Sequence, residues 1–163
     1  MNKRIFDIDL DRCVGCYSCV VSCMDQNDIL PADRAFMWRG VSSLSAGGKI
    51  QYVSLACMHC EDAPCITACP TGAVSRDEVT NLVESDKAIC IGCHSCLMTC
   101  PFGAPKFDGD GLMEKCHGCS VRVANGLIPA CVRVCPTKAL KYDTAENIEK
   151  VKKLRTLKKA LTR

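Results

Sequence analysis

The cysteines of this chain constrain its fold more than any other feature. The sequence of 163 residues contains sixteen cysteines, which form four groups of four with none left over. The groups are Cys13, Cys16, Cys19 and Cys23; Cys57, Cys60, Cys65 and Cys69; Cys90, Cys93, Cys96 and Cys100; and Cys116, Cys119, Cys131 and Cys135. Aromatic residues make up only 5% of the chain, so little bulk is left for an ordinary core. We therefore expect the fold to depend on whatever the cysteines bind.

The spacing within the groups indicates iron–sulfur clusters. The first and third groups read C-x2-C-x2-C-x3-C, the run with which bacterial-type ferredoxins hold cubane [4Fe–4S] clusters. In two-cluster ferredoxins the fourth cysteine of this run ligates the other cluster. A proline follows Cys69, Cys100 and Cys135 and is expected to turn the chain out of a helix. Because a cubane needs four thiolates, the count predicts four [4Fe–4S] clusters.

Disulfides and zinc are the competing uses of so many cysteines. Disulfide scaffolds are typical of secreted proteins, and the charged, alternating stretch Met1–Leu10 does not read as an export signal. A disulfide within C-x2-C also closes too short a loop to constrain the unfolded chain much. Structural zinc sites usually pair two C-x2-C knuckles rather than follow the 2-2-3 spacing. Both alternatives are weaker than iron–sulfur clusters.

Two kinds of motif alternate along the chain. CVGCYSCVVSC in the first group matches CIGCHSCLMTC in the third, and CITACPTGAV in the second matches CVRVCPTKAL in the fourth. This A-B-A-B order predicts two copies of a two-cluster ferredoxin unit. Sequential and nested pairing of the groups both give each unit one motif of each kind. The basic residues Arg12 and Lys115, each directly before a leading cysteine, slightly favour nesting.

Short helices and hairpins are expected between the groups, so the predicted fold class is α+β. The predicted strands are Arg4–Asp9, Val74–Arg76, Thr80–Glu84 and Leu140–Tyr142, with a further hairpin near Phe36–Val53. This further hairpin either shields a cluster from water or docks a partner. The predicted helices, which carry the closing thiolates, are Tyr17–Asp25, Ile66–Cys69, Leu97–Cys100 and Ala130–Cys135.

The combination of CMHCEDAPC-x3-CPTGAV, CIGC-x2-C-x3-CPFGAP and KCHGC-x11-C-x3-CP resembles a known family. It is similar to the iron–sulfur electron-transfer subunits of dimethyl sulfoxide reductase, formate dehydrogenase, formate hydrogenlyase and related molybdenum or tungsten pterin enzymes. The resemblance runs from about Ile5 to Asp143. It implies nested pairing, with four ligand sets: set 1, Cys13, Cys16, Cys19 and Cys135; set 2, Cys57, Cys60, Cys65 and Cys100; set 3, Cys69, Cys90, Cys93 and Cys96; set 4, Cys23, Cys116, Cys119 and Cys131.

Nesting defines the expected domains. A polyferredoxin body spans residues 1–143, with one ferredoxin-like unit from 1–30 plus 110–143, a second from 53–109, and a hairpin insertion at 31–52. Residues 144–163 are expected to form a basic amphipathic helix, which Thr144 can cap. Its expected apolar face is Ile148, Val151, Leu154, Leu157 and Leu161. That helix either folds on its own body, docks on a partner subunit or a second copy, or lies on an anionic membrane surface.

The predicted function is electron transfer without catalysis, because the sequence has no dinucleotide fingerprint and no Ser/His/Asp set. The resemblance implies a catalytic pterin-metal oxidoreductase partner; a hydrogenase, a flavoprotein or a membrane-anchor subunit are further candidate partners. The alternatives are a free-standing polyferredoxin that serves hydrogenases or other redox enzymes, and a protein that uses clusters or zinc only as structural staples. No nucleic-acid partner is expected.

Histidines and hydropathy complete the sequence predictions. His59, His94 and His117 lie inside ligand loops whose cysteine sets are complete, so they are expected to pack or to hydrogen-bond near the sulfurs. Tuning of a reduction potential is the alternative. No stretch has the apolar length of a spanning helix, and Lys3-Arg4 does not read as a twin-arginine signal. The expected location is the cytoplasm.

Overall fold

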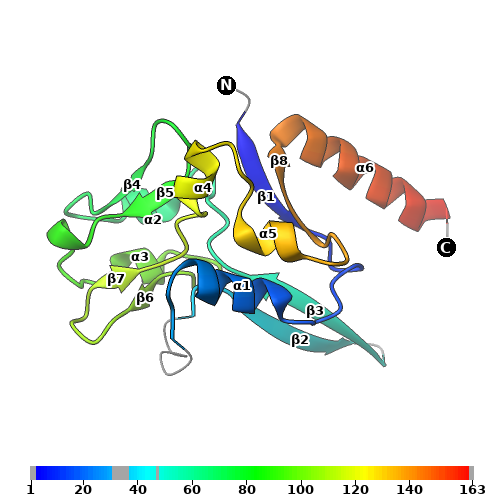
Figure 1. Cartoon of the computed structure of the whole chain (residues 1–163), viewed down its shortest axis with the longest axis horizontal. Helices are drawn as coiled ribbons and strands as arrows, with labels where there is room; N and C mark the ends of the chain where they lie inside the picture. Colours follow the sequence, from blue (N-terminus) through cyan, green and yellow to red (C-terminus); the bar gives the residue numbers. More distant parts are fainter. Residues whose placement is uncertain (1–2, 31–36, 47, 162–163) are drawn as a thin grey trace.

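The computed structural model describes residues 3–30, 37–46 and 48–161. Short helices connect four separate two-stranded antiparallel sheets, and a longer helix ends the described chain (Figure 1). The elements are β1 (Arg4–Ile8), α1 (Ser18–Gln26), β2 (Gly40–Ala46), β3 (Lys49–Leu55), α2 (Pro64–Thr67), β4 (Val74–Arg76), β5 (Val83–Ser85), the 3-10 turn η2 (Lys87–Ile89), α3 (Ser95–Met98), β6 (Lys106–Phe107), β7 (Met113–Glu114), α4 (Ser120–Ala124), α5 (Ala130–Val134), β8 (Leu140–Thr144) and α6 (Ala145–Leu161). The α+β class with hairpins, short helices and a C-terminal helix is confirmed.

The first and last strands of the described chain pair in one sheet. β1 pairs antiparallel with β8, with Arg4 opposite Thr144 and Ile8 opposite Leu140. α1 packs on α5, and the β2–β3 hairpin lies beside α1 in the same half of the molecule (Figure 1). The middle of the chain forms the other half, which contains the β4–β5 and β6–β7 hairpins and helices α2 and α3.

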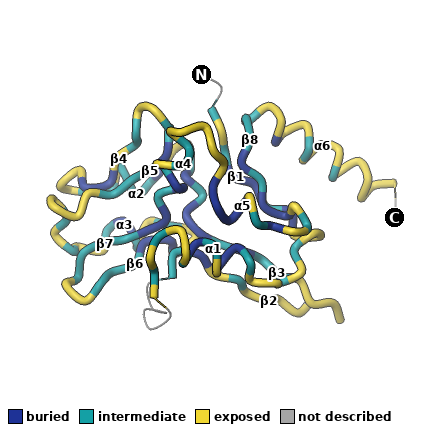
Figure 2. The backbone as a smooth tube through the Cα atoms, in the orientation of Figure 1, coloured by how far each residue is buried: buried dark blue, intermediate teal, exposed yellow. Residues whose placement is uncertain are grey.

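Cysteines belong to every buried cluster of the interior. In the first hydrophobic group, Phe6, Leu140 and Tyr142 pack with cysteines of sets 1 and 4. A second hydrophobic group surrounds Cys96, and a third contains both Cys57 and Cys116. Figure 2 shows buried backbone concentrated where α1, α5, β1 and β8 meet, with exposed backbone toward the loops and α6. The cysteines therefore occupy the places that aliphatic and aromatic side chains usually fill.

The predicted bounds of two helices were wrong. α2 and α3 begin two residues earlier than expected and end at Thr67 and Met98, before the closing cysteines Cys69 and Cys100. The reason is the proline after each closing cysteine, because a residue before proline disfavours the helical region. Cys135, which also precedes a proline, is extended at φ −63° and ψ 108°. The other two predicted helices lie within one residue of α1 and α5.

The predicted strands are present with shifted ends. β1 and β8 match the expected strands, and the hairpin expected near Phe36–Val53 is β2–β3; Phe36 itself lies outside the described residues. The strand expected at Thr80–Glu84 begins only at Val83. Asp77 Oδ1 accepts hydrogen bonds from the backbone N–H and the hydroxyl of Thr80, both at 2.6 Å, which holds these residues in a wide turn. The strands β6 and β7 and the helix α4 were not predicted from the sequence.

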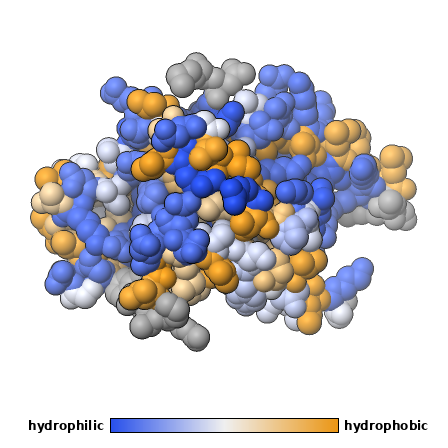
Figure 3. Space-filling model, in the orientation of Figure 1, coloured by the Kyte–Doolittle hydropathy of each residue, from blue (hydrophilic) through white to orange (hydrophobic). Residues whose placement is uncertain are grey.

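The C-terminal helix α6 is present, but most of its apolar face is not covered by the described chain. Thr144 Oγ1 accepts a hydrogen bond from the N–H of Asn147 at 3.3 Å, so the predicted cap is confirmed. Ile148 is 1% exposed, whereas Leu154, Leu157 and Leu161 are 59%, 56% and 86% exposed. Apolar side chains are visible along this helix at the right of Figure 3. Among the described helices, none is both long enough and apolar enough to cross a membrane.

Charged contacts attach α6 to its own body. Arg155 Nη2 lies 2.9 Å from Asp7 Oδ2, and its Nε lies 3.0 Å from Asp9 Oδ2, an ionic contact outside hydrogen-bond geometry. Lys159 reaches Asp11 Oδ2 at 2.8 Å. Asp7 and Asp9 are both buried. The helix therefore folds against β1 and β8 and leaves its leucines facing outward.

Candidate metal centres

Three cavities are each lined by four cysteines. Their linings contain the complete sets 4, 3 and 1. In every case three cysteines come from one stretch and the fourth from a distant stretch of the chain. Three cavities with identical donor chemistry suit three copies of one cofactor.

The cysteines of set 2 are also brought near one another. Cys57 belongs to a group of buried apolar side chains, and Cys100 packs against the same group. The negative charges of Cys100 and Cys60 raise the pKa of the Cys65 thiol, although burial is the larger cause of that shift. The structure thus brings the sixteen candidate ligands together at four sites, with four cysteines at each site.

The donor chemistry of these sites fits iron–sulfur clusters. All sixteen cysteines are free thiols. In the described part of the chain, no three Cys, His, Asp or Glu side chains converge closely enough to bind one metal ion. Four thiols that surround a cavity, each able to ligate a different iron atom, suit a cubane.

Glycine shapes the loop between the first two cysteines of three groups. Gly15, Gly92 and Gly118 have φ of +68°, +64° and +69°, a left-handed backbone conformation that glycine adopts without strain. The equivalent position in the second group is His59, which adopts φ +48°. A non-glycine residue in this region costs free energy, so the His59 side chain must make contacts that compensate.

The first and third cysteine groups share their loop conformation as well as their spacing. Tyr17 and His94, at equivalent positions, have φ of 61° and 62° and ψ of 0°. The next residue in each motif, Ser18 or Ser95, places its hydroxyl 3.5 Å from the sulfur of Cys16 or Cys93. The repeat seen in the sequence is therefore a repeat of loop conformation.

His59 is buried and lies against a cysteine of set 4. Its Nδ1 accepts the backbone N–H of Val83 at 2.9 Å, so the ring proton resides on Nε2, which lies 3.9 Å from Cys116 Sγ. The ring also stacks on Phe6, with centroids 5.5 Å apart. Burial lowers the pKa of His59 well below its usual value. The neutral ring thus points an N–H toward the sulfur, as expected from the sequence.

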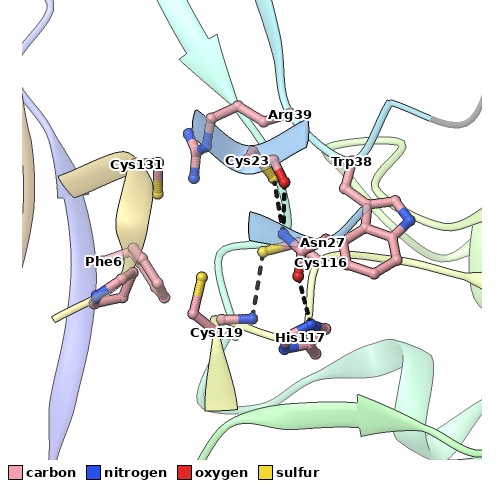
Figure 4. A pocket seen from close by; sticks show the side chains of 11 residues that line it. Phe6, Cys23, Asn27, Trp38, Arg39, Cys116, His117, Cys119 and Cys131 are labelled. Carbon is pink, nitrogen blue, oxygen red and sulfur yellow. Dashed lines mark hydrogen bonds between the residues drawn. The ribbon is translucent and has the colours of Figure 1, made fainter. Parts of the chain in front are cut away.

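His117 acts on set 4 through Asn27. The His117 Nδ1 accepts the N–H of Ser120 at 3.2 Å, which leaves Nε2 to donate to Asn27 Oδ1 at 2.8 Å. Asn27 Nδ2 in turn donates to the Cys23 carbonyl at 2.7 Å and lies 3.7 Å from the Cys23 sulfur (Figure 4). The third histidine, His94, stacks on Phe107 with centroids 3.7 Å apart.

The β2–β3 hairpin covers set 1. Ser54 Oγ lies 3.2 Å from Cys19 Sγ, and the Tyr17 hydroxyl donates to the Val41 carbonyl at 3.4 Å. Val41 and Ser54 line the set 1 cavity. The shielding role considered for the hairpin agrees with these contacts. Its outward Leu44 and Ile50 are exposed.

Two buried cations lie among the cysteines. Arg39, from the segment before β2, lines the set 4 cavity and is 3% exposed (Figure 4). Burial lowers the pKa of Arg39, but the charges of the surrounding cysteines outweigh burial and raise it. Lys115, directly before Cys116, is also 3% exposed. Sequence reasoning did not identify Arg39, and it used Lys115 only as a clue to pairing.

Burial separates the inner thiols from the outer ones in acidity. Burial raises the pKa of Cys23 to about 12 and that of Cys131 to about 11. At the surface, a hydrogen bond between Cys16 and Ser18 lowers the pKa of Cys16, and one between Cys93 and Ser95 lowers that of Cys93. Burial thus disfavours the thiolates of Cys23 and Cys131, which a nearby positive charge stabilises.

Comparison with known proteins agrees with this chemistry. Two family profiles, both described as 4Fe-4S dicluster domains, match residues 48–145 and 12–73. The B subunit of anaerobic dimethyl sulfoxide reductase from Escherichia coli (strain K12) is 38% identical over 155 residues, covering 89% of this chain and 75% of the relative. Thiosulfate reductase electron transfer subunit PhsB of Salmonella typhi is 39% identical over 153 residues, covering 91% and 79%. Formate dehydrogenase iron-sulfur subunit of Wolinella succinogenes is 35% identical over 182 residues, covering 94% and 88%.

Proposed function

Because the chain belongs to the 4Fe-4S dicluster family of iron–sulfur electron-transfer subunits, we propose that it conducts electrons through four clusters held by the nested sets 1 to 4. The chain itself is a non-catalytic electron-transfer subunit, and its cofactors are four [4Fe–4S] clusters. When bound, each cluster takes up and releases one electron at a time. The observation that carries the nested assignment is that three cavities are each lined by one complete nested set.

We propose that the sets form a line in the order 1, 4, 2, 3. Cysteines of sets 1 and 4 pack in one group of buried apolar side chains, and Cys116 of set 4 packs with Cys57 of set 2 in another. Cys65 of set 2 packs against the group of buried apolar side chains that contains Cys96 of set 3. The exposed ligands are Cys16 and Cys93, in the first and last sets of this line. Electrons are thus expected to enter at one exposed end and leave at the other.

The proposed fold is a duplicated bacterial-type ferredoxin. One unit comprises residues 1–30 plus 110–143 and the other 53–109, with an insertion at 31–52 and a tail at 144–163. The pairing of β1 with β8 supports a unit built from both chain ends. The equal conformations of Tyr17 and His94 support duplication.

The proposed partner is a catalytic molybdenum or tungsten pterin oxidoreductase. The relatives are named as parts of a dimethyl sulfoxide reductase, a thiosulfate reductase and a formate dehydrogenase, which supports a catalytic partner in general. A membrane-anchor, hydrogenase or flavoprotein subunit remains a further candidate. The cytoplasmic location also stays a prediction, and fractionation of the native host checks it.

Anaerobic purification of the tagged chain from its native host tests these proposals. We expect about sixteen iron atoms per chain, a brown colour that dithionite bleaches reversibly, and a co-purified subunit that contains pterin and metal. Far fewer iron atoms would overturn the four-cluster assignment. Full iron with no catalytic subunit would favour the free-standing polyferredoxin. For the nested pairing, Cys135→Ala should abolish the same redox step as Cys13→Ala, and sequential pairing predicts different steps.

A further inference from the structure

Arg39 and Lys115 are buried without a carboxylate partner among the described residues. Arg39 Nη1 donates to Ser54 Oγ at 3.0 Å, and its Nε has no hydrogen-bond partner in the described structure. The Lys115 ammonium donates to the carbonyl oxygens of Val83 and Cys116. An unpaired buried charge is costly. Something negative in the loaded protein must therefore balance both cations.

Each cation lies at a junction between two cysteine sets. Arg39 lines the set 4 cavity near Cys23 and Cys131 (Figure 4). Its hydrogen-bond partner Ser54 also contacts Cys19 of set 1 at 3.2 Å. Arg39 thus stands between sets 1 and 4.

Lys115 occupies the corresponding place between sets 4 and 2. It directly precedes Cys116 of set 4 and bonds to that residue's carbonyl at 3.1 Å. Cys116 packs in the same buried cluster as Cys57 of set 2. Neither cation lines the set 3 cavity.

We propose that Arg39 and Lys115 are internal countercharges of the electron path, each making the two clusters beside it easier to reduce. The proposal rests on the nested sets of the proposed function. Reduction adds one electron, and therefore one negative charge, to a cluster site. A fixed positive charge at the junction stabilises the added negative charge, and no proton needs to be taken up. Net charge, hydrogen bonds and solvent exposure are the features that set cluster potentials.

The proposal assigns a specific pattern to the four potentials. Arg39→Gln is expected to lower the reduction equilibrium constants of sets 1 and 4, and Lys115→Gln those of sets 4 and 2. The expected decrease is about tenfold, which corresponds to about 59 mV for one electron. One redox step should therefore shift in both variants, and one step, that of set 3, in neither.

Anaerobic redox titration of the loaded protein, followed by electron paramagnetic resonance, measures these potentials. Iron content is determined on the same samples. Arg39→Lys and Lys115→Arg keep the charge and are expected to restore the lost potential. The matched control is Arg133→Gln, which removes the same charge from an exposed position on α5 and should change every constant by less than about twofold.

Distinct results overturn the inference and the proposed function. Full iron content with unshifted potentials in Arg39→Gln and Lys115→Gln overturns the countercharge proposal alone. Equal shifts in Arg39→Gln and Arg39→Lys also overturn it, because hydrogen bonding rather than charge would then be responsible. Wild-type protein with far fewer than about sixteen iron atoms instead contradicts the proposed function. If Arg39→Gln does not load, Lys115→Gln and Lys115→Arg decide the proposal by the same criteria.

Discussion

Set 4 and set 3 offer the same four thiols in opposite surroundings. All four cysteines of set 4 are buried, whereas set 3 has one buried, two half-buried and one exposed cysteine. Around set 4, Asn27, His59 and the N–H of Gly118 point toward sulfur. Around set 3, the sulfurs are approached by the hydroxyls of Ser95 and Thr71 near the surface.

The exposed set 3 and the buried set 4 suit two different tasks in the proposed electron path, which are contact with a redox partner and internal transfer. An exposed ligand such as Cys93 shortens the distance to a redox partner, and the neighbouring Ile91 and Met98, 65% and 85% exposed, offer that partner apolar contact. A buried set has no direct access to a partner. It is shielded from water and oxidants, and its burial also joins the two halves of the chain. Ligand type alone does not determine which task a set performs.

Removal of all iron should show the largest difference between set 3 and set 4. With a chelator under anaerobic conditions, we expect about four irons to leave set 3 first and those of set 4 to leave last, because water and chelator reach the exposed sulfur. Loss of the set 4 iron should coincide with loss of the fold, since its cysteines belong to the core. Iron release and circular dichroism, recorded together, check the order. Simultaneous release from all sets would remove the distinction.

Single ligand variants sharpen the comparison. Cys131→Ser should lower the thermal midpoint by roughly 10 °C, because Cys131 is 5% exposed and lies in α5 where it packs on α1. Cys93→Ser should cost at most one cluster and a much smaller part of the midpoint. Anaerobic melting curves with iron analysis measure both. A larger loss of stability in Cys93→Ser would reverse our assignment of inner and outer roles.

Alanine substitutions at two glycines with nearly the same backbone conformation, one near set 4 and one near set 3, measure how tightly each site is packed. Gly118 and Gly72 have φ of +69° and +71°, so alanine at either position should cost about 1–2 kcal/mol from the left-handed backbone. A Cβ on Gly118 would lie 2.7 Å from Leu82 Cδ2, whereas one on Gly72 meets nothing within 4 Å. Gly118→Ala should therefore lose a further 1–3 kcal/mol or so from overpacking. Equal midpoints in thermal unfolding would show that the inner loop can adjust.

The smallest expected effect concerns α6, which braces only the half that contains β1 and β8. Arg155→Met removes the ion pair of the buried Asp9 and leaves the buried Asp7 with Lys152 alone, at 3.6 Å, so it should cost about 2 kcal/mol. Lys153→Met, on the exposed surface of the same helix, should stay within about 0.5 kcal/mol of the wild type. Thermal midpoints of the loaded variants measure both. Matching values for the two variants would mean that the Arg155 ion pairs do not stabilise this half.

Local spacing predicted more of the site than of its surroundings. The four cysteine groups, the A-B-A-B repeat and the Thr144 cap followed from short motifs, whereas the nested sets followed from the family resemblance. The helix ends expected at Cys69 and Cys100 were wrong, because proline restricts the backbone of the residue before it as well as ending a helix at its own position. The pattern of α6 predicted an apolar face, but periodicity does not say whether anything covers Leu157. Arg39 reaches the cysteines only through tertiary packing, and no motif marks it.

The antiparallel pairing of β1 with β8 has a consequence for how the protein is made. The set 2 and set 3 cysteines all lie between Cys57 and Cys100, whereas sets 1 and 4 need residues from both ends of the chain. During translation, the proposed middle unit is complete long before the last strand leaves the ribosome, and domains generally fold as units during synthesis. Assembly should therefore begin with the middle pair of clusters, and delivery of iron to the remaining pair must wait until translation reaches β8.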